Sequence, residues 1–274
     1  MNTKNVYKFG ICLLSALALN VSAQDFRGKD LNTSFRDKRI DNYQFQKARA
    51  IKGVTDFQRS AGESPDFEGA SLLGVSFRNA VISKANFESA NLQGAIISGA
   101  DIRSASFEGA NLEGADLYRA TLLDSKFPKA NLKNARMDAM KVSDECDFSK
   151  ADLTQASATD MDLTRADFSK ANLTNTNFSR SLMANSDLRK TVMEKTDFTA
   201  CNLIAANFKG VKLNNVNFAK AGLSQAEFGG ATFNNVNLQE ADLSLTTFND
   251  VDLSRTQLQK AKFAQSKVKN MKFN

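Results

Sequence analysis

Six basic residues recur at a nearly regular spacing in the second half of the sequence, and together they could bind a negatively charged partner. The series comprises Lys129, Lys150, Lys170, Arg189, Lys190 and Lys209. A structure with a period of about 20 residues would align these side chains, and such a ladder attracts anionic polymers, phosphate-rich surfaces or acidic protein patches. Asp147, Asp167 and Asp187 follow the same period and would neutralise part of the charge. Two interpretations therefore stay open, an anion-binding ladder and a self-compensated surface.

The rest of the sequence offers little material for catalysis. It contains no histidine, which removes the commonest general base and the usual catalytic zinc ligand. The aspartate series supplies single carboxylates, too few for the six or more oxygens that calcium prefers. The sequence also lacks a glycine-rich phosphate loop and a cluster of unpaired carboxylates. We therefore expect no enzyme, no metal site and no cofactor.

A five-residue repeat organises most of the chain. An apolar residue recurs at every fifth position from Phe67 to Val142, and after one extra residue near 143–147 the series continues from Phe148 to Phe273. The one small residue at a central position is Ala158. A small residue, most often alanine, stands two positions before nearly every centre, with Met140, Met161 and Met271 as the bulky exceptions. Asp or Asn often stands directly before the centre. Because a period of five fits neither helix nor strand, each repeat is predicted to form one short edge and then turn.

The repeat motif A(D/N)(L/F)XX, as in Ala-Asn-Leu-Glu-Gly at 110–114, resembles the pentapeptide repeat family over about residues 67–273. The resemblance implies an all-β, right-handed quadrilateral β-helix with four repeats per coil, hence about 10 coils within 67–274 and a one-residue bulge near 143–147. Phe67, Phe87 and Phe107 lie 20 residues apart and should stack in one column. The column should continue through Phe148 beyond the bulge, so we expect one continuous rod.

Two cysteines fall at the small, inward position of their repeats. Cys146 and Cys201 are 11 repeats apart, which places them on different faces and about 13 Å apart along the axis. This separation exceeds the distance that a disulfide can bridge. We expect two small buried core residues, with a reactive thiol as the alternative.

The N-terminal part differs from the repeats. Residues 1–23 contain Lys4 and Lys8, an apolar run too short to span a bilayer, and small residues before Ala23. This pattern predicts a signal peptide cleaved after Ala23, export to the periplasm or medium, and a mature chain without a transmembrane segment. Residues 24–66 are predicted to form an irregular cap or atypical first coils, with a short helix around 42–52 as one alternative.

The last predicted coil carries Phe263, Val268 and Phe273, whose exposure would invite pairing. Family members commonly dimerise through that end, so the resemblance implies a homodimer.

Three functions remain open. The first is a non-catalytic extracytoplasmic structural or protein-interaction rod with an unidentified protein partner. The second follows from family members that mimic DNA and protect topoisomerases, although the formal charge of +6 and the predicted export count against it and against nucleic acid as a partner. The third is a binder of anionic surfaces or polymers through the lysine ladder.

Overall fold

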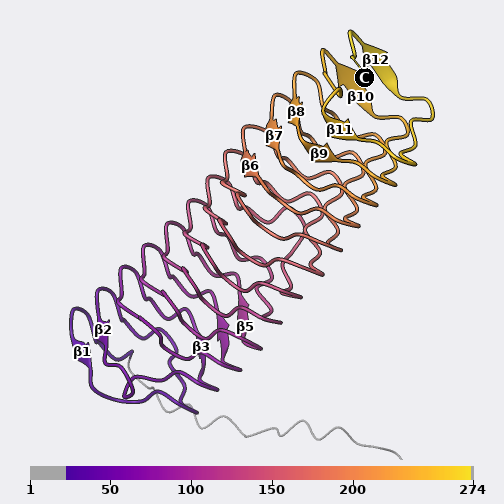
Figure 1. Ribbon diagram of the computed structural model, residues 1–274. Helices are drawn as coiled ribbons and strands as arrows, with labels where there is room; N and C mark the ends of the chain where they lie inside the picture. Colours follow the sequence, from indigo (N-terminus) through magenta and orange to yellow (C-terminus); the bar gives the residue numbers. More distant parts are fainter. Residues whose placement is uncertain (1–22, 273–274) are drawn as a thin grey trace, which may run out of the picture.

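The computed structural model describes residues 23–272 as an elongated rod of about 12 stacked coils (Figure 1). The described residues contain no helix. Each coil has four short edges separated by corners, and the apolar residues at the repeat centres fill its interior. The predicted fold class, an all-β quadrilateral β-helix, is confirmed.

The strands are two or three residues long and pair in parallel with the coil above or below. They are β1 (Asp30–Leu31), β2 (Arg49–Ala50), β3 (Ala61–Glu63), β4 (Val81–Ser83), β5 (Asp101–Arg103), β6 (Val192–Glu194), β7 (Lys212–Asn214), β8 (Thr232–Asn234), β9 (Val236–Asn237), β10 (Thr247–Asn249), β11 (Thr256–Gln257) and β12 (Lys267–Lys269). They form the sheets β3-β4-β5 and β6-β7-β8 and the pairs β1-β2, β9-β11 and β10-β12. Isolated parallel bridges connect the other coils.

The corners explain why the strands are so short. The residue two positions after a repeat centre adopts a positive φ, for example 64° at Gly94 and 54° at Arg119. Backbone hydrogen bonds to the next coil hold this conformation, and the Asp or Asn before the centre accepts the N–H two residues later. In the repeat centred on Phe148, Asp147 Oδ1 accepts the Ser149 N–H at 2.8 Å. The Asp/Asn preference of the motif is therefore a preference for a side chain that satisfies a corner amide.

Phenylalanine rings stack along the axis of the rod. Phe67 and Phe87 have ring centroids 4.8 Å apart, and Phe87 and Phe107 are 4.9 Å apart, with nearly parallel planes. Stacking persists at 5.1 Å between Phe127 and Phe148 on either side of the bulge. These offset stacks and the dense packing around them stabilise the interior.

The bulge is confined to one corner. Bridges join residues 20 apart before it, such as Thr121 with Lys141, and 21 apart across it, such as Lys141 with Asp162. The positive φ of this corner falls on Glu145, which is exposed and lies 3.4 Å from Arg165. The extra residue thus extends outward and leaves the core columns aligned.

Residues 24–66 form two coils with unequal lengths. The β1-β2 pairing joins Asp30 to Arg49, a step of 19 residues, and the bridge from Arg49 to Ser71 is a step of 22. The core columns nevertheless continue, since Phe57 stacks 4.7 Å from Phe35 and 4.9 Å from Phe77. Residues 42–52 contain β2 and turns, and no helix.

One central position in these coils belongs to a glycine. Gly62 lies beside Ile40, and a Cβ at Gly62 would come within 2.8 Å of Ile40 Cγ1. The Ile40 side chain therefore occupies the space that a larger residue at position 62 would need.

The structure describes neither end of the chain in full. The signal peptide predicted for residues 1–23 lies outside the described residues except for Ala23, and Phe273 lies outside them as well. In the last described coil, Phe263 is partly buried and Val268 is 51% exposed. Within the described chain, no helix has the length and apolar character needed to cross a bilayer.

Candidate anion-binding surfaces

The four lysines of the ladder occupy the same corner of successive coils. Lys129, Lys150, Lys170 and Lys190 are exposed, and all have positive φ between 58° and 63°. Backbone bonds fix their register, since Lys129 N donates to Ser149 O at 2.9 Å and Lys150 N to Ser169 O at 3.0 Å. The structure thus brings these side chains into one column.

Half of the six-residue series is neutralised by neighbouring carboxylates. Lys129 Nζ lies 2.6 Å from Glu108, and this hydrogen bond raises the pKa of Lys129. Arg189 lies 2.6 Å from Asp187, and the hydrogen bonds from its guanidinium lower the pKa of Asp187. Lys209 Nζ pairs with Glu227 at 2.5 Å.

The lysines in the middle of the ladder differ from these three residues in having no ion pair in the part of the chain that the structure describes. Within the described chain, Lys150, Lys170 and Lys190 form no ion pair. The aspartates that run beside them are engaged at the corners, because Asp147 accepts the Ser149 N–H and Asp167 accepts the Ser169 N–H. Lys129, Arg189 and Lys209 therefore have direct ion pairs, whereas three lysines on consecutive coils have none among the described residues and are offset only by the charge of the neighbouring aspartate column.

Metal ligands and the two cysteines are the remaining groups that could support chemistry. Among residues 23–272 no group of three or more His, Cys, Asp or Glu side chains is placed to hold a metal ion. Cys146 and Cys201 are both buried and free, and burial raises the pKa of each thiol to about 12. A thiol with such a pKa stays protonated at neutral pH and is a poor nucleophile.

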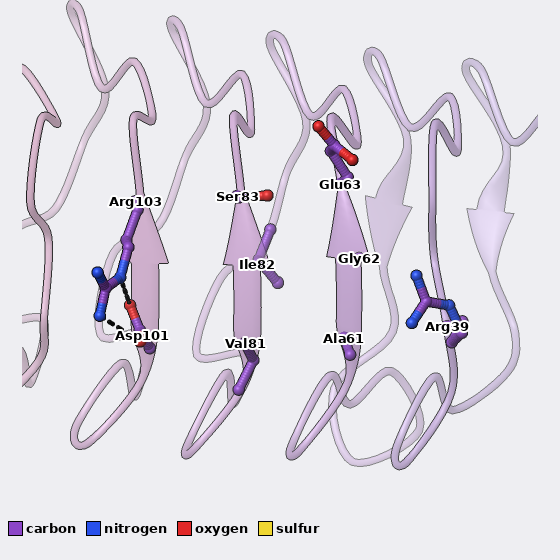
Figure 2. Close-up of a pocket in the computed structure, with 9 residues that line it drawn as sticks. All are labelled: Arg39, Ala61, Gly62, Glu63, Val81, Ile82, Ser83, Asp101 and Arg103. Atoms are coloured by element: carbon purple, nitrogen blue, oxygen red, sulfur yellow. Dashed lines mark hydrogen bonds and ion pairs between the residues drawn. The ribbon is translucent and has the colours of Figure 1, made fainter. Parts of the chain in front are cut away.

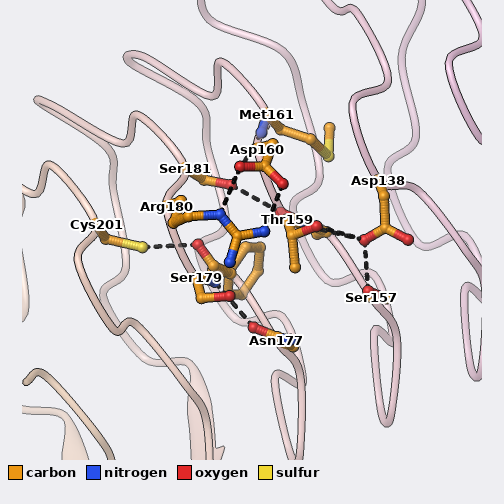
Figure 3. Close-up of polar contacts among 12 residues, drawn as sticks. Asp138, Ser157, Thr159, Asp160, Met161, Asn177, Ser179, Arg180, Ser181 and Cys201 are labelled. Carbon is orange, nitrogen blue, oxygen red and sulfur yellow. Dashed lines mark hydrogen bonds and ion pairs between the residues drawn. The ribbon is translucent and has the colours of Figure 1, made fainter.

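Cys201 also has a structural partner. Its Sγ donates to Phe178 O at 2.7 Å, as Figure 3 shows. Thr176 and Thr196 occupy the same small position and donate to the equivalent carbonyls, each at 2.8 Å. Cys201 therefore behaves as one of several small side chains that satisfy a backbone carbonyl of the preceding coil.

A hollow of about 280 Å³ crosses β3, β4 and β5 (Figure 2). Arg39 stands at one end, the Asp101–Arg103 ion pair stands at the other, and Val81 between them is 59% exposed. Arg39 is itself paired with Asp41 at 2.8 Å, and Glu63 with Lys84 at 2.8 Å. Because these charges are already paired, the hollow offers no free charge to hold a ligand.

A network of polar side chains covers another part of the surface (Figure 3). Burial raises the pKa of Asp138, but hydrogen bonds from Ser157 and Thr159 outweigh it, and the net pKa lies below the usual value. Arg180 binds Asp160 through two nitrogens at 2.7 and 2.6 Å and lowers the pKa of that carboxyl.

A second hollow, of about 350 Å³, lies on the same face of the rod in earlier coils, and sequence reasoning missed it. Its wall includes Arg78, Ser98, Gly99, Tyr118, Arg119 and Arg136. The signal that could have found it is the glycine at position 99, one coil before Arg119, where Arg180 has Asp160 one coil before it.

Two protein-family models match the repeat region of the sequence. A model described as pentapeptide repeats (8 copies) matches residues 66–99 and 95–134. A second, described as a pentapeptide repeat region, matches 161–235 and 182–257. Together they cover more than half of the chain, which therefore belongs to the pentapeptide repeat family. A comparison with curated proteins finds no match.

Several solved structures are similar to this chain. HetL, a pentapeptide repeat protein involved in heterocyst differentiation regulation from the cyanobacterium Nostoc sp. strain PCC 7120, is 20% identical, with 91% of each chain covered and a TM-score of 0.23. Full-length QnrB1, a plasmid-mediated fluoroquinolone resistance protein, is 17% identical over 87% of this chain and 93% of its own, with a TM-score of 0.24. At these identities and scores the likeness carries no information on partners.

Proposed function

We propose that the protein is a non-catalytic, extracytoplasmic rod that presents fixed columns of side chains to another protein. The observation that supports this proposal is that the buried residues fix the fold, while the outward-facing residues are free to vary. One continuous core holds every outward position at a defined height along the axis, even across the bulge near 143–147. A rigid surface of this kind binds a partner with little loss of conformational entropy.

The absence of histidine from the sequence and the two buried thiols support the non-catalytic part of the proposal. The extracytoplasmic part depends on the signal peptide predicted for residues 1–23.

Cell fractionation with N-terminal sequencing tests the location. We expect a mature chain that begins at Gln24 and is recovered from the periplasm or the medium. An unprocessed chain in the cytoplasm would contradict export and favour the topoisomerase-protecting alternative, which a supercoiling assay in the presence of a gyrase inhibitor would then examine directly.

The ladder supports a second candidate, the binding of an anionic surface or polymer. Lys150, Lys170 and Lys190 form no ion pair within the described chain and stand one coil apart. We expect the triple variant Lys150→Gln, Lys170→Gln, Lys190→Gln to elute from a heparin column at lower salt than the parent protein.

A matched variant separates the ladder from net charge alone. Lys38→Gln, Lys52→Gln, Lys220→Gln removes the same charge from exposed lysines outside the ladder. An equal shift in the two triple variants would show that the ladder has no special role.

The predicted homodimer also belongs to this proposal. Phe263 and Val268 could pair end to end with a second copy, but the same coil carries cations on several sides, among them Lys260, Lys262, Lys267 and Lys269. Association through this end should therefore strengthen with salt, which screens their repulsion. Light scattering after size exclusion measures this, and a monomeric mass at every salt and protein concentration would refute the dimer.

A further inference from the structure

We propose that Arg78 and Arg119 form a binding site for a phosphate monoester, seated over the coil that contains Ser98 and Gly99. This site is separate from the lysine ladder, and it follows from two arginines that form no ion pair among residues 23–272.

Pairing is the rule for arginine in this protein. All arginines of the sequence lie within residues 23–272, and all but Arg78, Arg119 and Arg255 form an ion pair there. Arg255 lies beside Asp250 and Asp252, and its charge helps to lower the pKa of Asp252. Arg78 and Arg119 both line the hollow of about 350 Å³.

The column that contains Arg119 shows which partner it lacks. Arg59 pairs with Asp37 at 2.6 Å, and Arg180 pairs with Asp160 at 2.6 Å (Figure 3). In both pairs the aspartate stands at the same corner one coil earlier. The residue at that place relative to Arg119 is Gly99, which offers no carboxylate to the guanidinium, and the Oδ1 of Asn79 lies 2.6 Å from the point that a Cβ at position 99 would occupy.

Arg78, on the other side of the site, also lacks the aspartate that an equivalent arginine has. Arg36 occupies the equivalent position two coils earlier and reaches forward one coil to Asp56, at 2.6 Å. The position that corresponds to Asp56 for Arg78 holds Ile96, which cannot accept a hydrogen bond. Arg78 reaching forward and Arg119 reaching back would therefore converge on the coil at 96–99.

The neighbouring side chains hold the site in place. Arg119 Cζ lies 4.9 Å from the centroid of the Tyr118 ring, and Arg136 Cζ lies 4.0 Å from it. Arg136 is anchored by Asp138 at 3.5 Å and by Asp116 at 3.9 Å, so its charge is largely satisfied. Stacking on a ring restricts a guanidinium without using its hydrogen-bond donors.

The shape and charge of the site indicate the class of ligand. Two guanidiniums suit a tetrahedral oxyanion, which accepts several charge-assisted hydrogen bonds. Ser98, Asn79 and Tyr118 add neutral polar groups around the hollow, and the one carboxylate in its wall, Asp116, lies 3.9 Å from Arg136. The neutral groups beside the guanidiniums suit a phosphate group attached to a small polar molecule.

Calorimetric titration of the folded protein at low ionic strength tests the site, with glucose 6-phosphate, inorganic phosphate and glucose as probes. We expect glucose 6-phosphate to bind more tightly than inorganic phosphate, and glucose not to bind. Arg78→Gln and Arg119→Gln should each weaken glucose 6-phosphate binding by at least about tenfold.

Position 99 provides a sharper variant. Gly99→Asp places a carboxylate where Asp160 stands relative to Arg180, and aspartate tolerates the left-handed conformation of this corner. Its Cβ would lie 2.6 Å from the present position of Asn79 Oδ1, so the Asn79 side chain must turn away, as it must in the Gly99→Asn control. This variant should lose phosphate binding, whereas Gly99→Asn, equal in size but neutral, should weaken it less. The triple ladder variant should bind glucose 6-phosphate like the parent protein.

Circular dichroism and the thermal midpoint verify that each variant is folded. The proposal is overturned if the parent protein binds neither phosphate probe, if glucose binds as well as its phosphate, or if a folded Arg78→Gln, Arg119→Gln double variant binds glucose 6-phosphate as tightly as the parent.

Discussion

The first two coils and the three that follow share one core but differ in their surfaces. In residues 25–63 each arginine is paired with an aspartate, including Arg36 with Asp56 and Arg59 with Asp37. In residues 76–119 only Arg103 of the three arginines is paired. The stacked phenylalanines run through both regions without interruption. The residues at outward positions therefore vary independently of the core. The repeat does not by itself require that an arginine be paired or unpaired.

The two regions also differ in the length of their coils. Steps of 19 and 22 residues in the first region give way to steps of 20 in the second. The residues gained or lost lie between Leu31 and Phe35 and between Ala50 and Phe57, at one corner of the rod. A corner is exposed and can absorb a change in length, whereas an edge cannot without shifting a core residue.

Removing a stacked phenylalanine should cost the most stability, and it shows whether the irregular first coils are packed as densely as the regular ones. Phe57 and Phe107 are both fully buried and stacked on both sides. Phe57→Ala and Phe107→Ala should each lower the free energy of unfolding by about 3–5 kcal/mol, because each leaves a cavity in a dense core. Urea unfolding followed by circular dichroism measures both. A much smaller loss for Phe57→Ala would mean that the first coils are loosely packed.

The sequence predicted the regular coils closely because the repeat itself encodes them. A large residue at the centre, a small one two positions earlier and an Asp or Asn between them each have a structural reason, and the Phe67 column stacks as expected. The coils of residues 24–66 were harder to predict, because Phe26, Leu31 and Phe35 are not spaced by a constant five residues. The structure shows that they form a complete coil, since Phe26 stacks on Phe45 at 5.2 Å and its N–H donates to Gln44 O at 2.7 Å.

A smaller effect is expected at Gly62, the glycine at a repeat centre in the first region. Gly62→Ala should destabilise the fold by roughly 1–3 kcal/mol, because the new Cβ would press on Ile40 in the preceding coil. Gly222 is the matched control, since the nearest atom to a Cβ there is Cys201 O at an ordinary 3.9 Å. Gly222→Ala should be neutral or stabilise by about 0.5 kcal/mol. Thermal unfolding compares them, and equal costs would show that the contact at Ile40 is relieved without strain.

The surface was only partly predictable. The series from Lys129 to Lys190 was visible because its members share a period, and the structure aligns them. Which of them are neutralised depends on side chains from other columns, such as Glu108 beside Lys129, and on rotamers that a repeat pattern does not specify. The pair Arg78 and Arg119 was missed because the informative feature is a glycine between them, which becomes meaningful only when columns are compared.

The smallest expected effect concerns the titration of the paired aspartates. The hydrogen bonds from Arg180 hold the pKa of Asp160 below its usual value, about 3.9 for aspartate in unfolded chains. A group with a lowered folded pKa stabilises the fold above its unfolded pKa, and this contribution is lost as the pH falls through the folded pKa. Arg180→Gln should therefore raise the pKa of Asp160, and its effect on stability should be greatest at neutral pH and disappear in acid.

Carbon-detected NMR of the carboxyl groups measures the pKa of Asp160. In the Gly99→Asp variant, the same experiment measures the pKa of a carboxyl group one coil before Arg119. If Arg119 stands free, the introduced carboxyl should titrate at a low pKa like that of Asp160, because it meets a guanidinium at the same corner one coil later. Adding Arg119→Gln should then return that pKa to its usual value. A carboxyl at position 99 that titrates normally in both backgrounds would show that Arg119 is turned away from this coil, and the distinction between the paired and unpaired regions would not hold.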